Sequence, residues 1–181
     1  MKQILLIRHC KASGQEPSAR LTAEGQLQAE QLVEFLTERH IDYILSSPFD
    51  RAIATIHPLA QKRNLKIHID DRLCERVLSS NPLPDWMEKL SESFMDLDLK
   101  FPGGESSREA MIRGVSVIHE LIERQEKHIA VVTHGNLLSL ILKYYNDRYG
   151  FNEWSSLTNP DVYELVISND EIQPSVNRVW K

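Results

Sequence analysis

Residues 3–9 read QILLIRH, an apolar run of four residues followed directly by an arginine and a histidine. Such a short run, with isoleucine at both ends and no polar residue inside it, is typical of a strand buried on both faces. Residues 129–135 read IAVVTHG and repeat the pattern, again with one polar residue and then a histidine after the apolar run. The two stretches predict a buried sheet with polar side chains at one edge.

Further strands and helices alternate along the rest of the chain. The expected strands are residues 3–8, 43–46, 66–70 and 129–133, with two closing strands at 161–168 and 171–180 that are joined at Asn169 and Asp170. The expected helices begin after Thr22, which is a favourable N-cap, and near Phe49, and cover residues 85–95, 105–124 and 136–144. This alternation predicts an α/β fold, a three-layer α/β/α sandwich with a mainly parallel central sheet flanked by helices.

Two local expectations concern the first two helices. Leu27, Leu32, Phe35 and Leu36 are expected to form the core-facing stripe of the first helix. Pro58 lies inside the second helix and is expected to kink it or end it early, because proline lacks the backbone N–H.

Length and composition indicate one globular domain over residues 1–181, since 41% of the residues are hydrophobic and 26% are charged. The net charge of −5 argues against nucleic acid or an anionic membrane as a partner. The apolar runs are far shorter than the ~20 residues that span a bilayer, and no secretory leader is recognisable, so a cytoplasmic location is expected. Two cysteines without C-x-x-C spacing predict neither a disulfide framework nor a zinc site.

Polar residues follow each predicted parallel strand. Arg8 and His9 follow the first strand, Arg51 lies one helical turn beyond the second, Glu75 lies beyond the third, and His134 follows the fourth. In a parallel α/β sheet, ligands bind at the carboxyl ends of the strands. We therefore expect these five side chains to meet at one edge of the sheet.

These residue types together suit phosphoryl transfer. Two guanidinium groups match phosphate oxygens, and a neutral imidazole can attack phosphorus to form a phosphohistidine. A second histidine can donate to an equatorial oxygen, and a carboxylic acid can protonate the leaving oxygen and later activate water. No metal ion or other cofactor is expected, because the arginines supply the positive charge, and the expected partner is a small phosphorylated substrate.

The same segments resemble the histidine phosphatase superfamily, also called the phosphoglycerate mutase-like family. The matching segments follow the family's order. They are 6–9 (LIRH), Leu21-Thr22 with Gly25 and Gln28-Ala29, Ser46-Ser47-Pro48 with Arg51-Ala52, Leu73 with Glu75, 102–106 (PGGES) and 132–135 (VTHG). The resemblance implies that His9 is the phosphorylated nucleophile and that Arg8, Arg51 and His134 complete the phosphate pocket. Glu75 matches the acid/base position of the family's smaller members, so the catalytic set is His9, Glu75 and His134.

Two features depart from the family pattern. Cys10 stands where the family usually has glycine, and residues 76–79 read RVLS, without the glycines that many phosphatase members carry after the acidic residue. Cys10 and Cys74 each neighbour a candidate catalytic residue. We interpret them as small hydrophobic residues beside a pocket rather than as a redox pair.

Three functions remain open, and a phosphatase is favoured. Residues 76–104 are expected to be an insertion that covers the pocket, and this segment is shorter than the resemblance would imply for a mutase. The Glu75-Arg76 pair keeps phosphoglycerate mutase-type phosphoryl transfer open, because mutases carry Glu-Arg at that place. The third alternative is a catalytically silent phosphate-binding module. None of these patterns indicates an oligomeric state.

Overall fold

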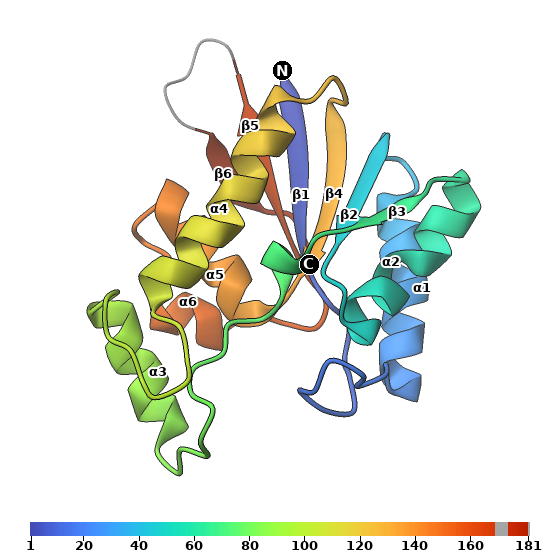
Figure 1. Cartoon of the computed structure of the whole chain (residues 1–181). Helices are drawn as coiled ribbons and strands as arrows, with labels where there is room; N and C mark the ends of the chain where they lie inside the picture. Colours follow the sequence, from blue (N-terminus) through green and yellow to red (C-terminus); the bar gives the residue numbers. More distant parts are fainter. Residues whose placement is uncertain (169–173, 181) are drawn as a thin grey trace.

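The apolar run at the N-terminus forms β1, a central strand of a six-stranded mixed sheet (Figure 1). The computed structural model describes residues 1–168 and 174–180. The strand order is β3-β2-β4-β1-β5-β6. The strands are β1 (Lys2–Arg8), β2 (Tyr43–Ser46), β3 (Ile67–Ile69), β4 (His128–Thr133), β5 (Asp161–Ile167) and β6 (Ser175–Arg178). The first four are parallel, whereas β5 and β6 are antiparallel additions at one edge.

Helices cover both faces of this sheet. They are α1 (Ala23–Leu36), α2 (Asp50–Arg63), the 3₁₀ turn η1 (Asp71–Leu73), α3 (Trp86–Met95), α4 (Ser107–Glu123), α5 (Gly135–Tyr145) and α6 (Phe151–Ser155). In Figure 1, α1 and α2 lie on one side of the sheet and α4 and α5 on the other. The predicted three-layer α/β/α sandwich is confirmed, and the predicted elements match the observed ones to within a few residues.

The two cores explain why the strands read as continuous apolar runs. Ile4 and Leu6 of β1 belong to the core under α4 and α5, whereas Leu5 and Ile7 belong to the core under α1 and α2. Successive side chains of a strand point to opposite faces, so a strand covered on both sides must be apolar throughout. The polar residues that follow β1 therefore mark where the covered part of the sheet ends.

Helix α1 begins as predicted, and its buried face contains two of the predicted residues, Leu32 and Leu36, but not Leu27. The Thr22 side chain accepts a hydrogen bond from the Gly25 N–H at 3.0 Å, which confirms the N-cap. The buried positions of the helix are Gly25, Ala29, Leu32 and Leu36.

Leu27 was expected in this stripe, and that expectation is wrong, because 60% of its surface is exposed. The helix approaches the rest of the protein through Gly25, where an added Cβ would clash with the backbone carbonyl of Lys11. Because the Gly25 side of the helix faces the protein, Leu27, two positions further on, faces the solvent. Phe35 is half-buried and packs edge-on against Trp180 at the margin of the core, with the ring centroids 5.1 Å apart.

Helix α2 does not end at Pro58. It continues to Arg63 and stops at Asn64, which adopts a left-handed conformation with a φ of 53°. Proline removes one hydrogen bond from the ladder. Leu59 and Ala60, directly after it, are buried in the core under α1 and α2, and this packing holds the last turn in place.

The C-terminal part of the chain closes the sheet as expected. Strand β5 pairs with β1 over seven residues, and β6 pairs with β5. The join expected at Asn169 and Asp170 lies outside the described residues. Among the residues that the structure describes, no helix has the length and apolar character needed to cross a membrane.

The buried face of α1 can be tested with two leucines of the same helix. Leu36 is fully buried, so Leu36→Ala is expected to lower the free energy of unfolding by about 2–5 kcal/mol. Leu27→Ala, the matched control, removes an exposed side chain and is expected to change it by less than about 1 kcal/mol. Urea unfolding followed by circular dichroism measures both, and equal losses would contradict the assigned face.

Candidate functional site

Parallel strand pairing brings the two candidate histidines together. Arg8 at the end of β1 lies opposite Thr133 at the end of β4, and the next backbone N–H, that of His9, donates to the Thr133 carbonyl at 3.1 Å. His134 follows Thr133 directly and is the N-cap residue of α5. The imidazole rings of His9 and His134 consequently lie 5.1 Å apart in an edge-to-face arrangement.

The hydrogen bonds of His9 define its tautomer. Its Nδ1 lies 2.7 Å from the Cys10 carbonyl oxygen, which can only accept, so Nδ1 carries the proton. Its Nε2 lies 3.1 Å from Nε of Arg51, which can only donate, so Nε2 holds the lone pair. His9 is thus oriented with a nucleophilic nitrogen toward the arginine.

Both histidines are kept neutral by their surroundings. Burial lowers the pKa of His9 to about 4, and the nearby Arg51 and Arg8 guanidinium groups act in the same direction. The pKa of His134 lies well below its ordinary value, first because the ring is buried and then because His9 and Arg51 are close. At neutral pH both rings therefore offer uncharged nitrogens.

His134 is held by a hydroxyl group and an aromatic ring. Its Nε2 lies 2.7 Å from Oγ of Ser47, the residue after β2, and the Phe49 ring lies 4.8 Å away edge-on. Its Nδ1 is buried and has no hydrogen-bond partner among the described residues. A buried nitrogen without a hydrogen-bond partner raises the free energy of the folded state, so this atom is suited to bind a ligand.

Arg51 is a buried cation and Arg8 a partly buried one, and both have neutral protein partners. Arg51 is 1% exposed; its Nη1 donates to the Glu16 carbonyl at 2.8 Å, and its guanidinium stacks over the Phe49 ring. Arg8 donates from Nη1 to the Leu157 carbonyl at 2.9 Å, and its Nε is buried without a partner among the described residues. Neither arginine forms an ion pair with a described carboxylate. Glu75 acts on both guanidinium groups through space without pairing with either, so the two arginines can still bind an anion directly.

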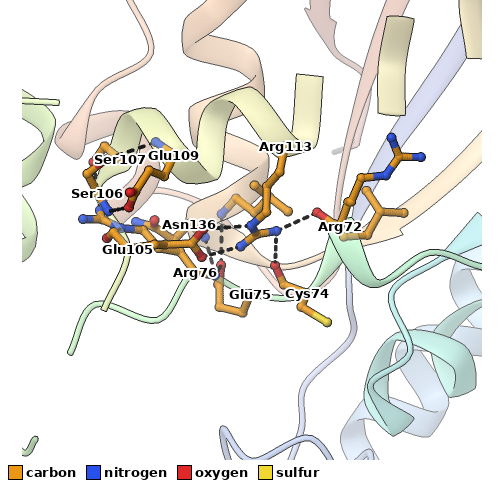
Figure 2. Close-up of polar contacts among 12 residues, drawn as sticks. Arg72, Cys74, Glu75, Arg76, Glu105, Ser106, Ser107, Glu109, Arg113 and Asn136 are labelled. Carbon is orange, nitrogen blue, oxygen red and sulfur yellow. Dashed lines mark hydrogen bonds and ion pairs between the residues drawn. The ribbon is translucent and has the colours of Figure 1, made fainter. Parts of the chain in front are cut away.

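Glu75 reaches the same edge through backbone hydrogen bonds (Figure 2). Its Oε1 accepts from the N–H groups of Arg76 at 2.8 Å and Leu137 at 3.0 Å, and its Oε2 accepts from the N–H of Asn136 at 3.0 Å. Two of these donors are in the first turn of α5, where unpaired N–H groups and the helix dipole favour a carboxylate. The helix that His134 begins therefore also positions Glu75.

A pocket of about 490 Å³ opens beside these groups. Its lining residues are Arg8, Gln15, Glu75, Arg76, Leu78, Trp86, Leu90, Gly135, Asn136 and Trp154. A slightly larger cavity of about 540 Å³ lies between α1 and α2, lined by residues such as Arg20 and Pro58, and contains none of the candidate residues. The smaller pocket is the better candidate for the functional site, because Arg8 and Glu75 line it and none of the five candidate residues lines the other.

Among the described residues, one group has the geometry of a metal site, and it lies elsewhere. His40, Asp42 and His128 have ligand atoms within 4.8 Å of one another. His128 begins β4, whereas His134 follows its end, so this group lies at the opposite edge of the sheet. The five candidate residues are not part of it.

Cys10 fits its position without backbone strain. Among the described residues other than glycine, a positive φ occurs at Asn64 and not at Cys10, and the Cys10 N–H donates to Oγ1 of Thr55 at 2.9 Å. Burial raises the pKa of the Cys10 thiol to about 11 and also raises that of Cys74. Both thiols are therefore protonated at neutral pH, which is the less reactive form.

All five predicted residues lie at the carboxyl-terminal edge of the sheet, as their positions after the strands predicted. Four further contacts were not predicted. Asn159 Nδ2 donates to the His9 carbonyl at 2.7 Å, from 150 positions away in the chain, so no local pattern could reveal it. Ser47 and Phe49 contact His134, and the backbone N–H of Asn136 donates to Glu75. These three residues lie in or next to the SSP and THG segments, and this proximity in the sequence could have indicated their roles.

The sequence profile of the histidine phosphatase superfamily, branch 1, matches residues 4–178. The chain belongs to this superfamily. The resemblance carried by the RH and THG segments is thereby confirmed.

Individual relatives in the superfamily are phosphatases. Phosphoserine phosphatase 1 of Hydrogenobacter thermophilus is 29% identical over 151 residues, which cover 74% of this chain and 71% of the relative. A mycobacterial glucosyl-3-phosphoglycerate phosphatase, solved with inorganic phosphate, superposes with a TM-score of 0.77 at 22% identity and covers 99% of this chain and 97% of its own. The alpha-ribazole phosphatase of Shigella flexneri gives 0.75 at 23% identity, covering 96% and 95%.

The superfamily member described here is a phosphoric monoester hydrolase, the class of the relatives named above. The two solved relatives are too distant in sequence to indicate more than the shared α/β fold. The substrate must therefore be argued from this chain's own residues.

The low pKa of His9 predicts a pH dependence of stability. In the unfolded chain the imidazole takes up a proton near pH 6.5, whereas in the folded protein it does so near pH 4. Between these values the unfolded state binds more protons, so the free energy of unfolding falls as the pH drops from 6.5 to about 4, by about 3 kcal/mol from this residue. Below pH 4 this contribution no longer changes.

Chemical denaturation at pH 7, 5.5 and 4 measures this effect. His9→Gln is expected to lose less stability over this range than the wild type does. His57→Gln removes an exposed histidine and serves as the matched control with wild-type behaviour. An unchanged pH dependence in His9→Gln would contradict the buried, neutral state of His9.

Proposed function

We propose that this protein is a metal-independent phosphatase that hydrolyses a small-molecule phosphomonoester through a phosphohistidine on His9. The observation that carries the proposal is the Nε2 lone pair of His9, held beside the buried Arg51, which forms no ion pair with a described carboxylate. A neutral imidazole at this position is ready to attack an electrophile, and the arginines favour a phosphate as that electrophile.

Arg8, Arg51 and His134 bind the substrate phosphate in this proposal. The unpaired Nε of Arg8 and the unpaired Nδ1 of His134 are both buried, so a phosphate oxygen would complete their hydrogen bonding. The guanidinium groups also neutralise the charge that spreads over the equatorial oxygens in the transition state. This is the contribution that a metal ion makes in other phosphoryl-transfer enzymes.

In the first step, Nε2 of His9 attacks phosphorus while the bond from phosphorus to the leaving oxygen breaks. Glu75 gives its proton to that oxygen, and the alcohol departs. Oε1 of Glu75 already accepts two hydrogen bonds and Oε2 accepts one, so Oε2 keeps a lone pair that can carry the proton.

In the second step, Glu75 takes a proton from water as the water oxygen attacks the phosphohistidine. The bond from phosphorus to Nε2 breaks, inorganic phosphate leaves, and His9 returns to its neutral tautomer. The hydrogen bond from Nδ1 to the Cys10 carbonyl persists through both steps and stabilises the positive charge that the ring carries while it is phosphorylated.

The segment 76–104 acts in this proposal as an insertion that covers the pocket within the single domain formed by residues 1–181. Four of its residues line the pocket: Arg76, Leu78, Trp86 and Leu90. A partly apolar wall excludes water from one side of the reacting groups and accommodates the organic part of a phosphomonoester.

The decisive experiment is turnover of p-nitrophenyl phosphate with EDTA present. The wild type is expected to hydrolyse it, and His9→Ala to lose about a thousandfold or more, because the substitution removes the proposed nucleophile. Acid-labile, base-stable ³²P labelling of the wild type during turnover would identify the phosphohistidine. His57→Ala is the matched control and is expected to keep wild-type turnover.

Two outcomes would redirect the proposal. If the wild type shows no turnover from pH 5 to 8 but interconverts phosphoglycerates, the mutase alternative is correct. If it binds phosphate or vanadate and yields no product with either substrate, it is a silent phosphate-binding module.

The role of Glu75 predicts a dependence on the leaving group. Glu75→Gln is expected to slow hydrolysis of an alkyl phosphate by about a hundredfold or more, because an alkoxide needs a proton to leave. The loss should be smaller for p-nitrophenyl phosphate, whose phenolate leaves without one. Glu88→Gln, an exposed carboxyl group on α3, is the control. Equal losses on both substrates would exclude an acid role for Glu75.

A further inference from the structure

A second group of polar side chains lies at the edge of the sheet opposite the candidate site. Tyr43 of β2 pairs with Ile129 of β4 in parallel register, so Asp42 and His128, the residues before them, lie side by side where the two strands begin (Figure 1). The backbone N–H of Asp42 donates to the His128 carbonyl at 2.9 Å. The parallel pairing that gathers the candidate catalytic residues at one edge therefore gathers a different set at the other.

Two imidazole nitrogens of this set face one carboxylate oxygen. Nε2 of His40 lies 3.9 Å and Nδ1 of His128 lies 3.6 Å from Oδ2 of Asp42, and all three atoms lie within 4.8 Å of one another. These separations are longer than hydrogen bonds. Two ligand atoms of one tetrahedral zinc ion, each about 2.0–2.1 Å from the metal, lie roughly 3.4 Å apart. A small closure would therefore bring the three atoms into the coordination sphere of one ion.

The set contains a buried nitrogen without a partner and a carboxylate without a cationic side chain. Nδ1 of His128 is buried and has no hydrogen-bond partner among the described residues. No described lysine or arginine forms an ion pair with Asp42. Lys2 donates to three carbonyl oxygens at the end of α4, and Arg39 and Arg124 are paired with glutamates. The lone pair and the negative charge both point to a bound cation.

The surrounding backbone holds these ligands in place. Oδ1 of Asp42 accepts from the His128 N–H at 3.1 Å, and Oδ2 accepts from the Lys127 N–H at 3.2 Å. The segment before His40 is fixed by Arg63, which donates to three carbonyl oxygens within residues 36–39. Hydrogen bonds of this kind orient the ligands of metal sites in proteins.

We propose that His40, Asp42 and His128 bind a divalent transition-metal ion such as Zn²⁺. Two imidazole nitrogens and one carboxylate oxygen are ligands that zinc takes, and three protein ligands leave a fourth position for water. The side chain of His40 is 68% exposed, so water and the ion can reach the site. Mg²⁺ and Ca²⁺ bind oxygen ligands, so a set with two nitrogens out of three disfavours them.

The position of the site indicates a structural effect. It joins the segment after α1 to the start of β4, whereas His134 follows the other end of the same strand. Strand residues rise about 3.3 Å each, so the six positions from 128 to 134 separate the two sites by roughly 20 Å. The ion therefore takes no part in the proposed reaction. Its effect is to stabilise the folded state, because only the folded chain brings the three ligands together.

Isothermal titration calorimetry of the untagged, metal-free full chain with Zn²⁺ tests the inference. The wild type is expected to bind one equivalent with a Kd of about 10 µM or lower, and Mg²⁺ is expected to give no binding heat. His40→Gln, Asp42→Asn and His128→Gln each remove one ligand and are each expected to weaken zinc binding by about tenfold or more.

Two histidine variants serve as controls. His57→Gln removes an exposed histidine of α2 and is expected to keep the wild-type affinity. His9→Gln is also expected to keep it, because the buried Arg51 beside His9 repels a cation. The melting temperature gives a second readout: free Zn²⁺ at about one hundred times the Kd is expected to raise that of the wild type by about 5–10 °C. His40→Gln, which changes an exposed side chain and is expected to fold, should show no such rise.

The outcomes separate this site from the proposed function. A wild type that does not bind Zn²⁺ overturns the metal site. Zinc binding that all three ligand variants retain, or that His9→Gln loses, overturns the assignment to His40, Asp42 and His128. Equal binding of Mg²⁺ overturns the class of ion. The titrations contain no phosphate ester, so their results do not depend on whether this protein hydrolyses one.

Discussion

The candidate site depends on the parallel pairing of β1 with β4. The register places Arg8 opposite Thr133, and the ladder continues one step further, where the His9 N–H binds the Thr133 carbonyl. Both segments leave the sheet at this level, so His9 and His134 emerge side by side. A slip of one residue would turn every side chain of the strand to the opposite face and would carry Gln3 or Arg8 into a position that an isoleucine fills, which the apolar packing of the two cores disfavours. Hydrophobic register therefore sets the geometry of the polar site.

In the proposed function, the burial that favours phosphate binding also prepares the nucleophile. Arg8 and Arg51 donate to backbone carbonyls, and neither pairs with a described carboxylate, so their positive charge acts on the neighbouring imidazoles and on any ligand alike. Desolvation and this charge together keep His9 and His134 neutral. Phosphate affinity and a free lone pair on His9 thus have one physical cause. A carboxylate placed beside Arg51 would weaken both at once.

Sequence reasoning found the parts of the site that follow from strand ends and missed those that depend on tertiary packing. The five candidate residues were predictable because polar residues directly after buried strands must gather at one edge of a parallel sheet. Leu27 was wrongly predicted to be buried, because α1 approaches the rest of the protein through Gly25. The spacing of large apolar residues cannot reveal such a contact at a glycine. Pro58 was expected to disturb α2, but burial of the next turn outweighs one lost hydrogen bond. That Nδ1 of His128 is buried without a partner among the described residues could not be foreseen, because an absent partner is a property of the folded neighbourhood.

Glu75, which follows β3 and η1, is tied to the first turn of α5 by hydrogen bonds. Its carboxylate is held by three backbone N–H groups rather than by side chains. Side chains at positions 76 and 136 can therefore change while the N–H groups that position the acid remain. Asn136 shows this separation within one residue, since its backbone binds Glu75 and its amide faces no protein partner among the described residues. Substitutions at these two positions can therefore alter the wall of the pocket without moving the proposed acid, because backbone N–H groups alone hold its carboxylate.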